Sequence, residues 1–221
     1  MMSPRICLVC DNLIGDSMGN YSHICITCEL ALPEAPNSNL AFDRFLRNFD
    51  TDNIAITNVY GLFSAQEYTD YLHIIHGLKY YGFLSIGKQF GKKLGEKIST
   101  ESDINYSAIV PVPLHPAKKR ERGFNQSNII AKTISKQIGV PLINMVRRDI
   151  YTQTQTKLSK VERQSNVEDV FKLRSSNFPL RNANILVIDD VLTTGATINA
   201  TASVLLSAGA RQVDCACLAI A

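Results

Sequence analysis

Residues 185–197 of this 221-residue chain read ILVIDDVLTTGAT, and Asn184 precedes them. The opening run of apolar residues predicts a buried strand from Ile185 to Asp189. Threonines and a glycine follow the two aspartates, and the apolar pattern of residues 197–208 predicts a helix. A strand, an acidic pair and a short loop before a helix are typical of the carboxyl edge of a parallel α/β sheet, where ligands bind.

The loop between this strand and this helix has the groups that hold a phosphate. Gly195 lets the backbone approach an anion, three threonine hydroxyls can donate hydrogen bonds, and the helix N-terminus adds partial positive charge. Asp189 and Asp190 can accept hydrogen bonds from sugar hydroxyls. The combination predicts a sugar phosphate, with its phosphate on the loop and its sugar over the aspartates. The alternative is a strand–turn–helix with two solvated aspartates and no ligand.

The rest of the chain alternates between strand and helix patterns. The further predicted strands span residues 53–63, 108–113, 141–146 and 213–220, and the further predicted helices span residues 67–82, 83–98 and 127–138. Residues 33–39 have the composition of a linker, and residues 147–165 are polar without a regular pattern. Apolar strands separated by helices predict an α/β fold, with a parallel sheet covered by helices on both faces.

Four of the six cysteines lie within the first thirty residues, as C-x2-C, a gap of 14 residues, and C-x2-C. They are Cys7, Cys10, Cys25 and Cys28. This spacing is typical of a structural zinc site, because adjacent thiolates repel one another unless a dication neutralises them. The metal also stabilises a segment too short to form its own core. The alternative is two disulfides, which require an oxidising compartment.

Two other patterns predict packing rather than chemistry. Cys215 and Cys217 point to one face of the last predicted strand and are interpreted as small buried apolar residues. Gly87, Gly91 and Gly95 recur every four residues in the helix predicted over residues 83–98. That spacing predicts a close approach to a neighbouring element.

The overall composition excludes several classes of protein. Lysine and arginine number 23 against 20 acidic residues, a formal net charge of +3, which is too mild to indicate nucleic-acid binding by itself. Hydrophobic residues make up 45% of the chain, which excludes a disordered or collagenous protein. No apolar run approaches the roughly 20 residues of a membrane helix, and the N-terminus lacks the pattern of a secretory signal. We therefore expect a soluble, cytoplasmic protein with no integral membrane segment.

Residues 185–197 resemble the thirteen-residue phosphoribosyl pyrophosphate (PRPP) signature of type I phosphoribosyltransferases. Nearly the whole chain resembles the ComF family of competence-associated proteins, which are similar to amidophosphoribosyltransferases. The resemblance rests on the four-cysteine segment, HGLKY at residues 76–80, VPVPLH at 110–115, RERGFNQ at 120–126, and the spaced set Thr154, Gln155, Leu158, Arg163, Asn166 and Phe171. Glu168 and Asp169 depart from it, because small or basic residues are expected before Phe171.

The resemblance implies a division of the chain and a set of roles. It implies a zinc-binding segment over residues 1–36, a hood-like helical region over 37–105, and a type I phosphoribosyltransferase-like α/β core over 106–221. A pyrophosphate loop would follow residues 110–113, and a mobile loop would span residues 152–166. Asp189 and Asp190 would be the catalytic pair that holds the ribose, and Mg2+ would accompany PRPP. The expected PRPP-binding residues are Val191, Leu192, Thr193, Thr194, Gly195, Ala196, Thr197, Leu114, His115, Arg120, Arg122, Lys157 and Arg163.

Two functions are compatible with these features. The first is an enzyme that transfers phosphoribose from PRPP to an unidentified acceptor. The second is a non-catalytic PRPP-sensing module that contacts single-stranded DNA and a competence DNA helicase. The resemblance places both in DNA uptake during natural transformation, with a cytoplasmic location or peripheral attachment to the inner face of the cytoplasmic membrane.

The basic residues also have two interpretations. The basic run over residues 118–122 lies just past the expected pyrophosphate loop, so it is either an anion contact or a solvated face. Lys79 is either a ligand contact or a favourable charge at a helix C-terminus. The lysine-bearing helix over residues 83–98, together with the cysteine segment, is a candidate DNA surface because phosphate contacts need only well-placed cations.

Overall fold

The computed structural model describes residues 5–15, 23–47, 53–65, 69–149, 170–175 and 177–221. Within these residues the main sheet has four parallel strands in the order β1-β6-β5-β2. The strands are β1 (Val59–Ser64), β2 (Ala108–Pro111), β5 (Asn184–Leu192) and β6 (Gln212–Ile220). The predicted parallel sheet is therefore confirmed, and its two central strands are the longest ones.

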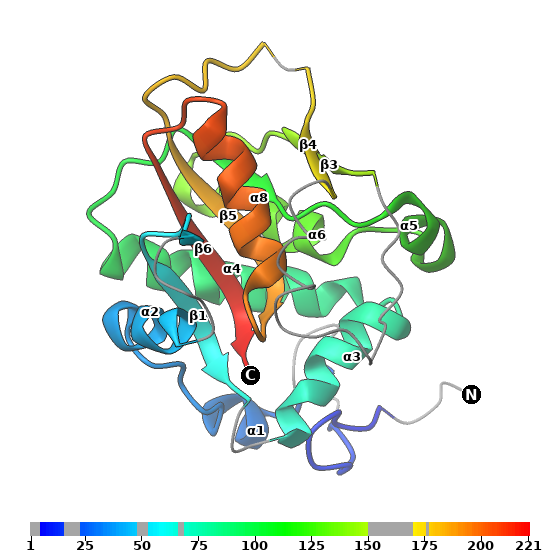
Figure 1. The fold of residues 1–221 in the computed structure, drawn as a ribbon. Helices are drawn as coiled ribbons and strands as arrows, with labels where there is room; N and C mark the ends of the chain where they lie inside the picture. The colour runs from blue at the N-terminus through cyan, green and yellow to red at the C-terminus, as the bar shows by residue number, and fades with distance from the viewer. Residues whose placement is uncertain (1–4, 16–22, 48–52, 66–68, 150–169, 176) are drawn as a thin grey trace.

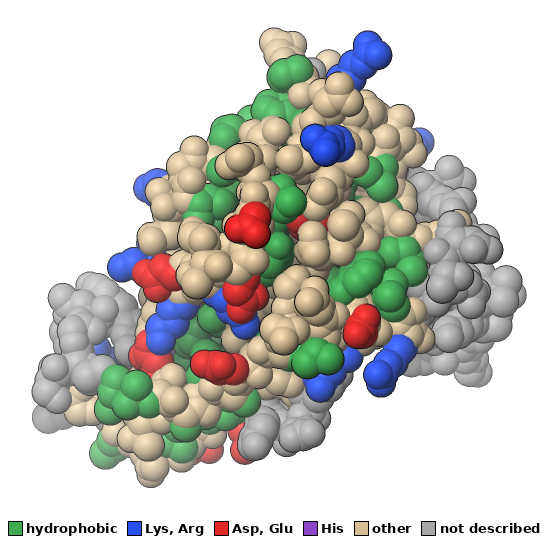
Figure 2. Space-filling model, turned by 90° about the vertical axis from the view of Figure 1, so that its left-hand side faces the viewer, with side chains coloured by type: hydrophobic (Ala, Val, Ile, Leu, Met, Phe, Trp, Pro, Cys, Tyr) green, Lys and Arg blue, Asp and Glu red, His purple; other side chains and the backbone are tan. Residues whose placement is uncertain are grey.

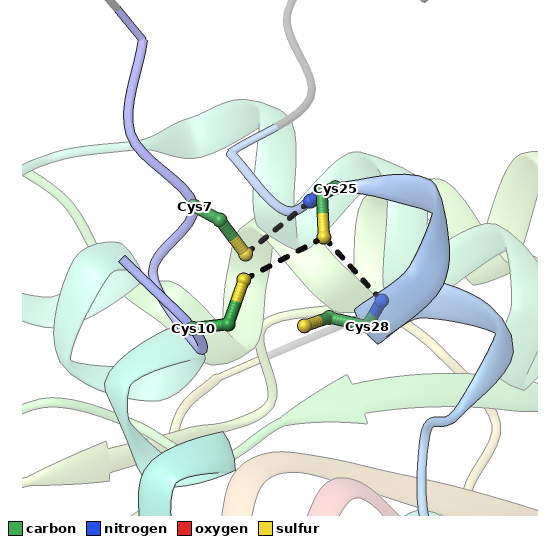
Figure 3. Close-up of side chains that lie close together, drawn as sticks. All are labelled: Cys7, Cys10, Cys25 and Cys28. Carbon is green, nitrogen blue, oxygen red and sulfur yellow. Dashed lines mark hydrogen bonds between the residues drawn. The ribbon is translucent and has the colours of Figure 1, made fainter. Parts of the chain in front are cut away.

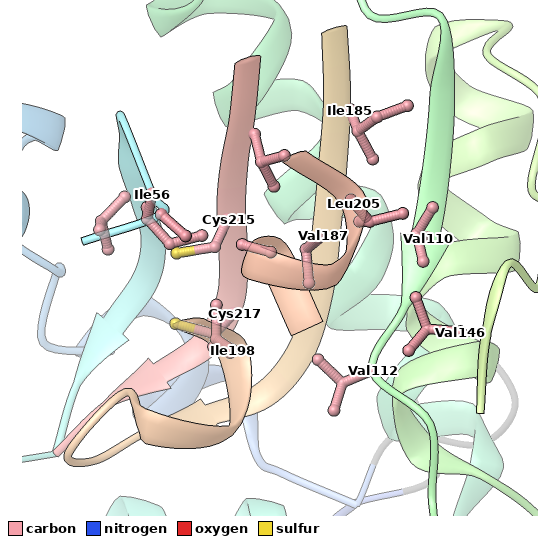
Figure 4. Packing of buried hydrophobic residues seen from close by; sticks show 14 of the residues in the cluster. Ile56, Val110, Val112, Val146, Ile185, Val187, Ile198, Leu205, Cys215 and Cys217 are labelled. Carbon is pink, nitrogen blue, oxygen red and sulfur yellow. The ribbon is translucent and has the colours of Figure 1, made fainter. Parts of the chain in front are cut away.

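Helices cover both faces of this sheet, as the sequence predicts (Figure 1). One face packs against α2 (Ser38–Leu46) and α8 (Ala196–Ser207). The other packs against α3 (Leu72–Tyr80), α4 (Leu84–Glu101) and α6 (Gln126–Ile138). Strand β5 supplies alternate residues to the two cores, with Ile185 and Val187 on the α8 side and Leu186 and Ile188 on the other. Figure 4 shows the α8 side, where Cys215 and Cys217 pack with Val187 as small buried residues.

Shorter elements surround these layers. They are α1 (Ile26–Leu30), the 3-10 helix η2 (Thr69–Tyr71), α5 (Pro116–Arg122), and an antiparallel pair formed by β3 (Val146–Arg148) and β4 (Phe171–Leu173). Helix α5 follows β2 directly and ends at Gly123. It therefore projects from the same carboxyl edge of the sheet as the loop after β5.

Helix α4 packs closely on α6, as its glycine spacing predicts. A Cβ atom at Gly91 would lie 3.2 Å from Cβ of Thr133 and 3.3 Å from the carbonyl oxygen of Ile130. A Cβ atom at Gly87 would lie 3.0 Å from Ile129. The three glycines thus allow the two helix backbones to approach each other.

Several sequence predictions were wrong in detail. Residues 33–39 do not form a simple linker, because Glu34 pairs with Phe63 and α2 begins at Ser38. Of the strand predicted over residues 141–146, only a bridge between Leu142 and Ile109 and the first residue of β3, Val146, are formed. Residues 147–165 were expected to lack structure, but β3 includes Arg147 and Arg148 because β4 pairs with them.

Strand β5 also continues further than predicted. It was expected to end at Asp189, but Val191 and Leu192 pair with Ala219 and Ile220 of β6. The aspartates therefore lie within a hydrogen-bonded strand rather than at the start of a loop. The expected division at residues 36 and 105 remains a prediction, although β1 joins residues 59–64 to the main sheet.

Candidate functional site

The acidic pair lies near the carboxyl end of β5 and makes different contacts on its two carboxylates. Oδ1 of Asp189 accepts hydrogen bonds from Oγ of Ser127 at 2.8 Å and from the backbone N–H of Asp190 at 2.9 Å. Oδ1 of Asp190 lies 3.0 Å from Nζ of Lys79. The pair is therefore held by α6 on one side and by α3 on the other.

Burial dominates the protonation of Asp189. Burial and the neighbouring charge of Asp190 raise the pKa of Asp189 to about 7, against the opposing effect of its hydrogen bonds and of Lys79. Close carboxylates resist simultaneous ionisation, so the pair carries less than two negative charges at neutral pH. Such a pair can both accept and donate hydrogen bonds to sugar hydroxyls.

The segment RERGFNQ, residues 120–126, positions the following residue, Ser127, which contacts Asp189. Gly123 ends α5 in the left-handed conformation, with φ of 79°. Asn125 caps α6 through the N–H of Ser127, and its side-chain amide donates to the carbonyl of Val112 at 2.9 Å. This cap places Ser127 against Asp189. Sequence analysis missed Ser127, although an Asn cap just before a predicted helix was a usable signal.

Cations of α3, α5 and β3 act on the aspartates or on one another at this site. Arg122 of α5 lies over the ring of Tyr80, 5.1 Å from its centroid, which joins α5 to the end of α3. Burial lowers the pKa of Lys118, and the positive charges of Arg122, Arg148 and Lys79 lower it further. Burial also lowers the pKa of Arg148, against the attraction of Asp189. Arg148 was missed because the sequence of β3 has no apolar periodicity.

The loop after β5 has the geometry of an anion cradle. Gly195 has φ of 78° and precedes α8, where Oγ1 of Thr194 accepts a hydrogen bond from the N–H of Ala196 at 3.5 Å. Thr193 and Thr194 are exposed, and Thr197 is half-buried in the first turn of the helix. The N–H groups and the dipole of a helix N-terminus favour an anion. Val191 and Leu192 belong to β5 instead, so their side chains pack rather than line the loop.

Phe45 of α2 packs against Gly195 of this loop. A Cβ atom at Gly195 would collide with Cε2 of Phe45. On the same side, the side chain of Asn199 in α8 donates to the carbonyl of Asn53 at 2.7 Å and accepts from the N–H of Ala55 at 2.8 Å. The loop and its helix thus contact Phe45, Asn53 and Ala55 on this side.

The remaining predicted ligand residues differ in what the structure shows of them. Nδ1 of His115 accepts from the N–H of Ala117 at 3.1 Å and caps α5, so in neutral His115 the proton lies on Nε2. Leu114 is half-buried beside it, and Arg120 is exposed on α5. Lys157 and Arg163 lie outside the described residues, as does the loop expected over residues 152–166.

The four N-terminal cysteines lie together, as their spacing predicts (Figure 3). Their sulfur atoms all lie within 4.8 Å of one another, and Sγ of Cys10 and Cys25 are 3.8 Å apart. None of the four forms a disulfide. A tetrahedral ion with sulfur ligands at about 2.3 Å spaces the sulfurs by about 3.8 Å. The set can therefore hold a metal ion.

Backbone groups favour negative charge on Cys7, whereas burial and the neighbouring cysteines raise the pKa of Cys28. Sγ of Cys7 accepts from the N–H groups of Cys25 at 3.3 Å and Val9 at 3.5 Å. Burial opposes ionisation, but these donors lower the pKa of Cys7 to about 7. A partly ionised thiol in a closed set of four sulfurs is suited to a structural metal rather than to a reaction, because four ligands leave no open position.

Comparisons with known proteins agree with this architecture. A family model described as the phosphoribosyl transferase domain matches residues 125–220. Competence protein F of Haemophilus influenzae is 36% identical over 110 residues, 48% of this chain and 47% of that protein. DNA utilization protein YhgH of Salmonella typhimurium is 30% identical over 164 residues, 71% of this chain and 70% of that protein. The chain thus spans about half the length of the first relative and most of the second.

Among solved structures, a purine phosphoribosyltransferase from Pyrococcus horikoshii is 19% identical with a TM-score of 0.39, covering 60% of this chain and 71% of that one. The glutamine PRPP amidotransferase of Bacillus subtilis is 18% identical with a TM-score of 0.40, covering 59% and 26%. The parallel sheet, its flanking helices and the matched domain define a protein with a type I phosphoribosyltransferase fold. Within this class, the YhgH match extends beyond the matched domain. The chain belongs to the ComF family.

The described residues contain no helix that combines the length and the apolar character needed to cross a membrane.

Proposed function

We propose that this protein binds PRPP at the carboxyl edge of β5 and transfers its phosphoribose group to an acceptor. The observation that carries the proposal is the arrangement around the acidic pair. A left-handed glycine and the N-terminus of α8 follow the pair in the chain, Lys79 of α3 contacts Asp190, and basic residues of α5 and β3 lie near Lys79. A sugar with phosphate groups at both ends fits a site that combines an anion-binding helix N-terminus, an acidic pair and basic side chains.

Each group has a definite role in this proposal. The N–H groups of residues 194–197 hold the 5′-phosphate, and Asp189 and Asp190 hold the ribose hydroxyls. The basic residues of α5 and β3 face the pyrophosphate, whose charge grows as it leaves. Mg2+ would accompany the pyrophosphate and lower its charge, and the carboxylate oxygens of the acidic pair are ligands of the type Mg2+ prefers. The acceptor forms a bond to C1, the C1–O bond breaks with its electron pair on pyrophosphate, and the acceptor loses a proton.

Isothermal titration calorimetry tests the binding step. The double variant Asp189→Asn with Asp190→Asn should reduce the affinity for PRPP with Mg2+ at least 100-fold, because amides replace both carboxyl groups that would hold the ribose hydroxyls. Asp43→Asn, on the exposed face of α2, is the control and should bind like the wild type. Undiminished affinity in the double variant would remove the site assignment.

Pyrophosphate release distinguishes an enzyme from a sensor. The protein is incubated with PRPP, Mg2+ and a panel of bases, amines and ammonia. Release that depends on one acceptor and disappears in the double variant supports transfer. Tight PRPP binding without release for any acceptor would favour the sensing module.

We propose zinc as the metal of the four-cysteine set. Four sulfur ligands select zinc over Mg2+ or Ca2+, which prefer oxygen. The spacing of the sulfurs supports this choice. Zinc content of about one ion per chain, lost when Cys10 and Cys28 are both replaced by serine, is the expected result.

A second candidate function is binding of single-stranded DNA, favoured by one surface. Tyr80 and Tyr81 are 63% and 68% exposed, and Arg122 lies over Tyr80. Exposed rings beside cations are suited to stacking with unpaired bases. Relatives are named for competence and DNA utilization. A competence helicase and attachment to the inner membrane face remain predictions.

This surface is a better DNA candidate than α4. Three α4 lysines make ion pairs with glutamates: Lys92 with Glu96, Lys93 with Glu29, and Lys97 with Glu101. Acidic and basic side chains are also intermixed over the face shown in Figure 2. The positive charge of α4 is therefore largely balanced, whereas α5 contributes four basic residues and one acidic residue.

Fluorescence anisotropy with labelled oligonucleotides tests this second function. Replacing Tyr80 and Tyr81 by alanine should weaken single-stranded DNA binding roughly 10- to 100-fold, and the affinity of the wild type should fall steeply with salt. Leu30→Ala, at an 80% exposed residue of α1, is the control. No binding at low salt would leave the enzyme as the supported function.

A further inference from the structure

Lys79 makes an ion pair with Asp190, and it comes from outside the strand–loop–helix unit that forms the predicted sugar-phosphate site. It lies in the last turn of α3, and its Nζ is 3.0 Å from Oδ1 of Asp190. Its side chain is 23% exposed, and that of Asp190 is 8% exposed. The ammonium therefore covers an oxygen that a ribose hydroxyl would use.

The end of α3 that carries Lys79 lies beside α5, whose cations are assigned to pyrophosphate. The next residue, Tyr80, lies under Arg122 of α5 at 5.1 Å, so the end of α3 and α5 are in contact. The positive charge of Lys79 also acts on Lys118 of α5. A lysine ammonium on its four-carbon stem can move several ångströms without movement of the helix. Lys79 thus has an acidic partner on β5, and its flexible stem starts from a helix end that contacts α5.

We propose that Lys79 makes the site select a ribose 5-phosphate that carries pyrophosphate on C1 over ribose 5-phosphate itself. The inference rests on the proposed function, because it assumes that ribose hydroxyls bind the acidic pair. When PRPP binds, the ammonium leaves Asp190 for the pyrophosphate, and a hydroxyl takes its place on the carboxylate. Ribose 5-phosphate has no pyrophosphate, so its hydroxyls must displace Lys79 without a new partner for the ammonium.

Calorimetry with two ligands tests this selection. In Lys79→Met, the affinity for PRPP should fall about 10-fold or more, because a charged hydrogen bond to pyrophosphate is lost. The affinity for ribose 5-phosphate should stay constant or rise, since no ammonium has to be displaced. The ratio of the two affinities should therefore fall at least 10-fold. Lys79→Arg keeps the charge and should restore most of the ratio.

Controls separate this role from a structural one. Lys93→Met removes a lysine of α4 that pairs with Glu29 at 2.7 Å, and should leave both affinities unchanged. Equal losses of affinity for both ligands in Lys79→Met would overturn the inference. The proposal that the wild type binds PRPP would still stand. Failure of the wild type to bind PRPP would instead overturn the proposed function.

A second variant keeps the inference falsifiable if Lys79→Met does not fold. Asp190→Asn breaks the same ion pair from the other side and releases the ammonium. Inorganic pyrophosphate without Mg2+ should then bind several-fold more tightly than to the wild type. Unchanged or weaker binding of metal-free pyrophosphate would contradict the inference.

Discussion

Asp189 shows how burial sets the chemistry of one residue in this site. Its carboxyl lies in the sheet, where loss of solvent and the charge of Asp190 raise its pKa to about 7, while Ser127 and a backbone N–H favour the charged form. A carboxyl group whose pKa is higher in the folded than in the unfolded state contributes most to the free energy of unfolding when it is protonated. Its contribution is therefore fully present below the ordinary value of 3.8 and is lost as the pH rises through about 7.

Replacing Asp189 by asparagine should make stability less dependent on pH. Between pH 5 and pH 8.5, the free energy of unfolding of the wild type should fall relative to Asp189→Asn by about 2–3 kcal/mol. Urea denaturation at the two pH values measures this difference. A constant difference between the two proteins would show that Asp189 titrates normally.

Gly195 combines a left-handed backbone with a close aromatic neighbour. An alanine there would have strained φ and a Cβ atom in collision with the ring of Phe45, so it should lower the free energy of unfolding by about 2–4 kcal/mol. Gly123 has φ of 79°, and a Cβ atom there would meet no described atom within 4 Å, so Gly123→Ala reports the backbone strain alone. Urea unfolding should show a clearly larger loss for Gly195→Ala. Equal losses would mean that Phe45 moves away freely.

At the scale of elements, local sequence patterns predicted individual strands and helices. Apolar runs predicted β5 and α8, and the regular glycine repeat predicted that α4 approaches a neighbouring element, but only the structure shows that this element is α6. The ion pair of Lys79 with Asp190 and the place of Arg148 depend on how distant elements pack, and no local pattern encodes that. Strand β3 was missed because it forms only through pairing with β4, far along the chain.

The α4–α6 contact should fail when its glycines are enlarged. Gly91→Leu should lower the free energy of unfolding by roughly 2–3 kcal/mol, because a Cβ atom already lies 3.2–3.3 Å from Thr133 and Ile130 of α6. Lys92→Leu, at the next and 65% exposed position, is the control and should change stability little. Thermal unfolding followed by circular dichroism measures both. A Gly91→Leu variant as stable as the wild type would show that α4 and α6 can move apart without a loss of stability.

At the scale of the whole molecule, the cysteine segment is attached to the helix that carries Lys79. The hydroxyl of Tyr71, just before α3, donates to the carbonyls of Cys28 and Ala31 at 3.2 and 3.0 Å. His23 stacks on Phe83, just after α3, with ring centroids 3.9 Å apart. The predicted metal site therefore supports α3 at both of its ends.

Removing the metal should weaken both the fold and the site. Chelation should lower Tm by roughly 5–10 °C and reduce the affinity for PRPP, because α3 loses a support. Differential scanning calorimetry before and after chelation, followed by re-addition of zinc, checks the effect and its reversal. An unchanged Tm in verified metal-free protein would show that the cysteine segment folds without an ion.

A crystal structure of the protein with PRPP and Mg2+ tests the central claim most directly. We predict the 5′-phosphate on the N–H groups of residues 194–197, the ribose hydroxyls on Asp189 and Asp190, and the pyrophosphate beside α5. A ligand bound elsewhere, or an acidic pair still covered by Lys79 at saturating PRPP, would contradict the account.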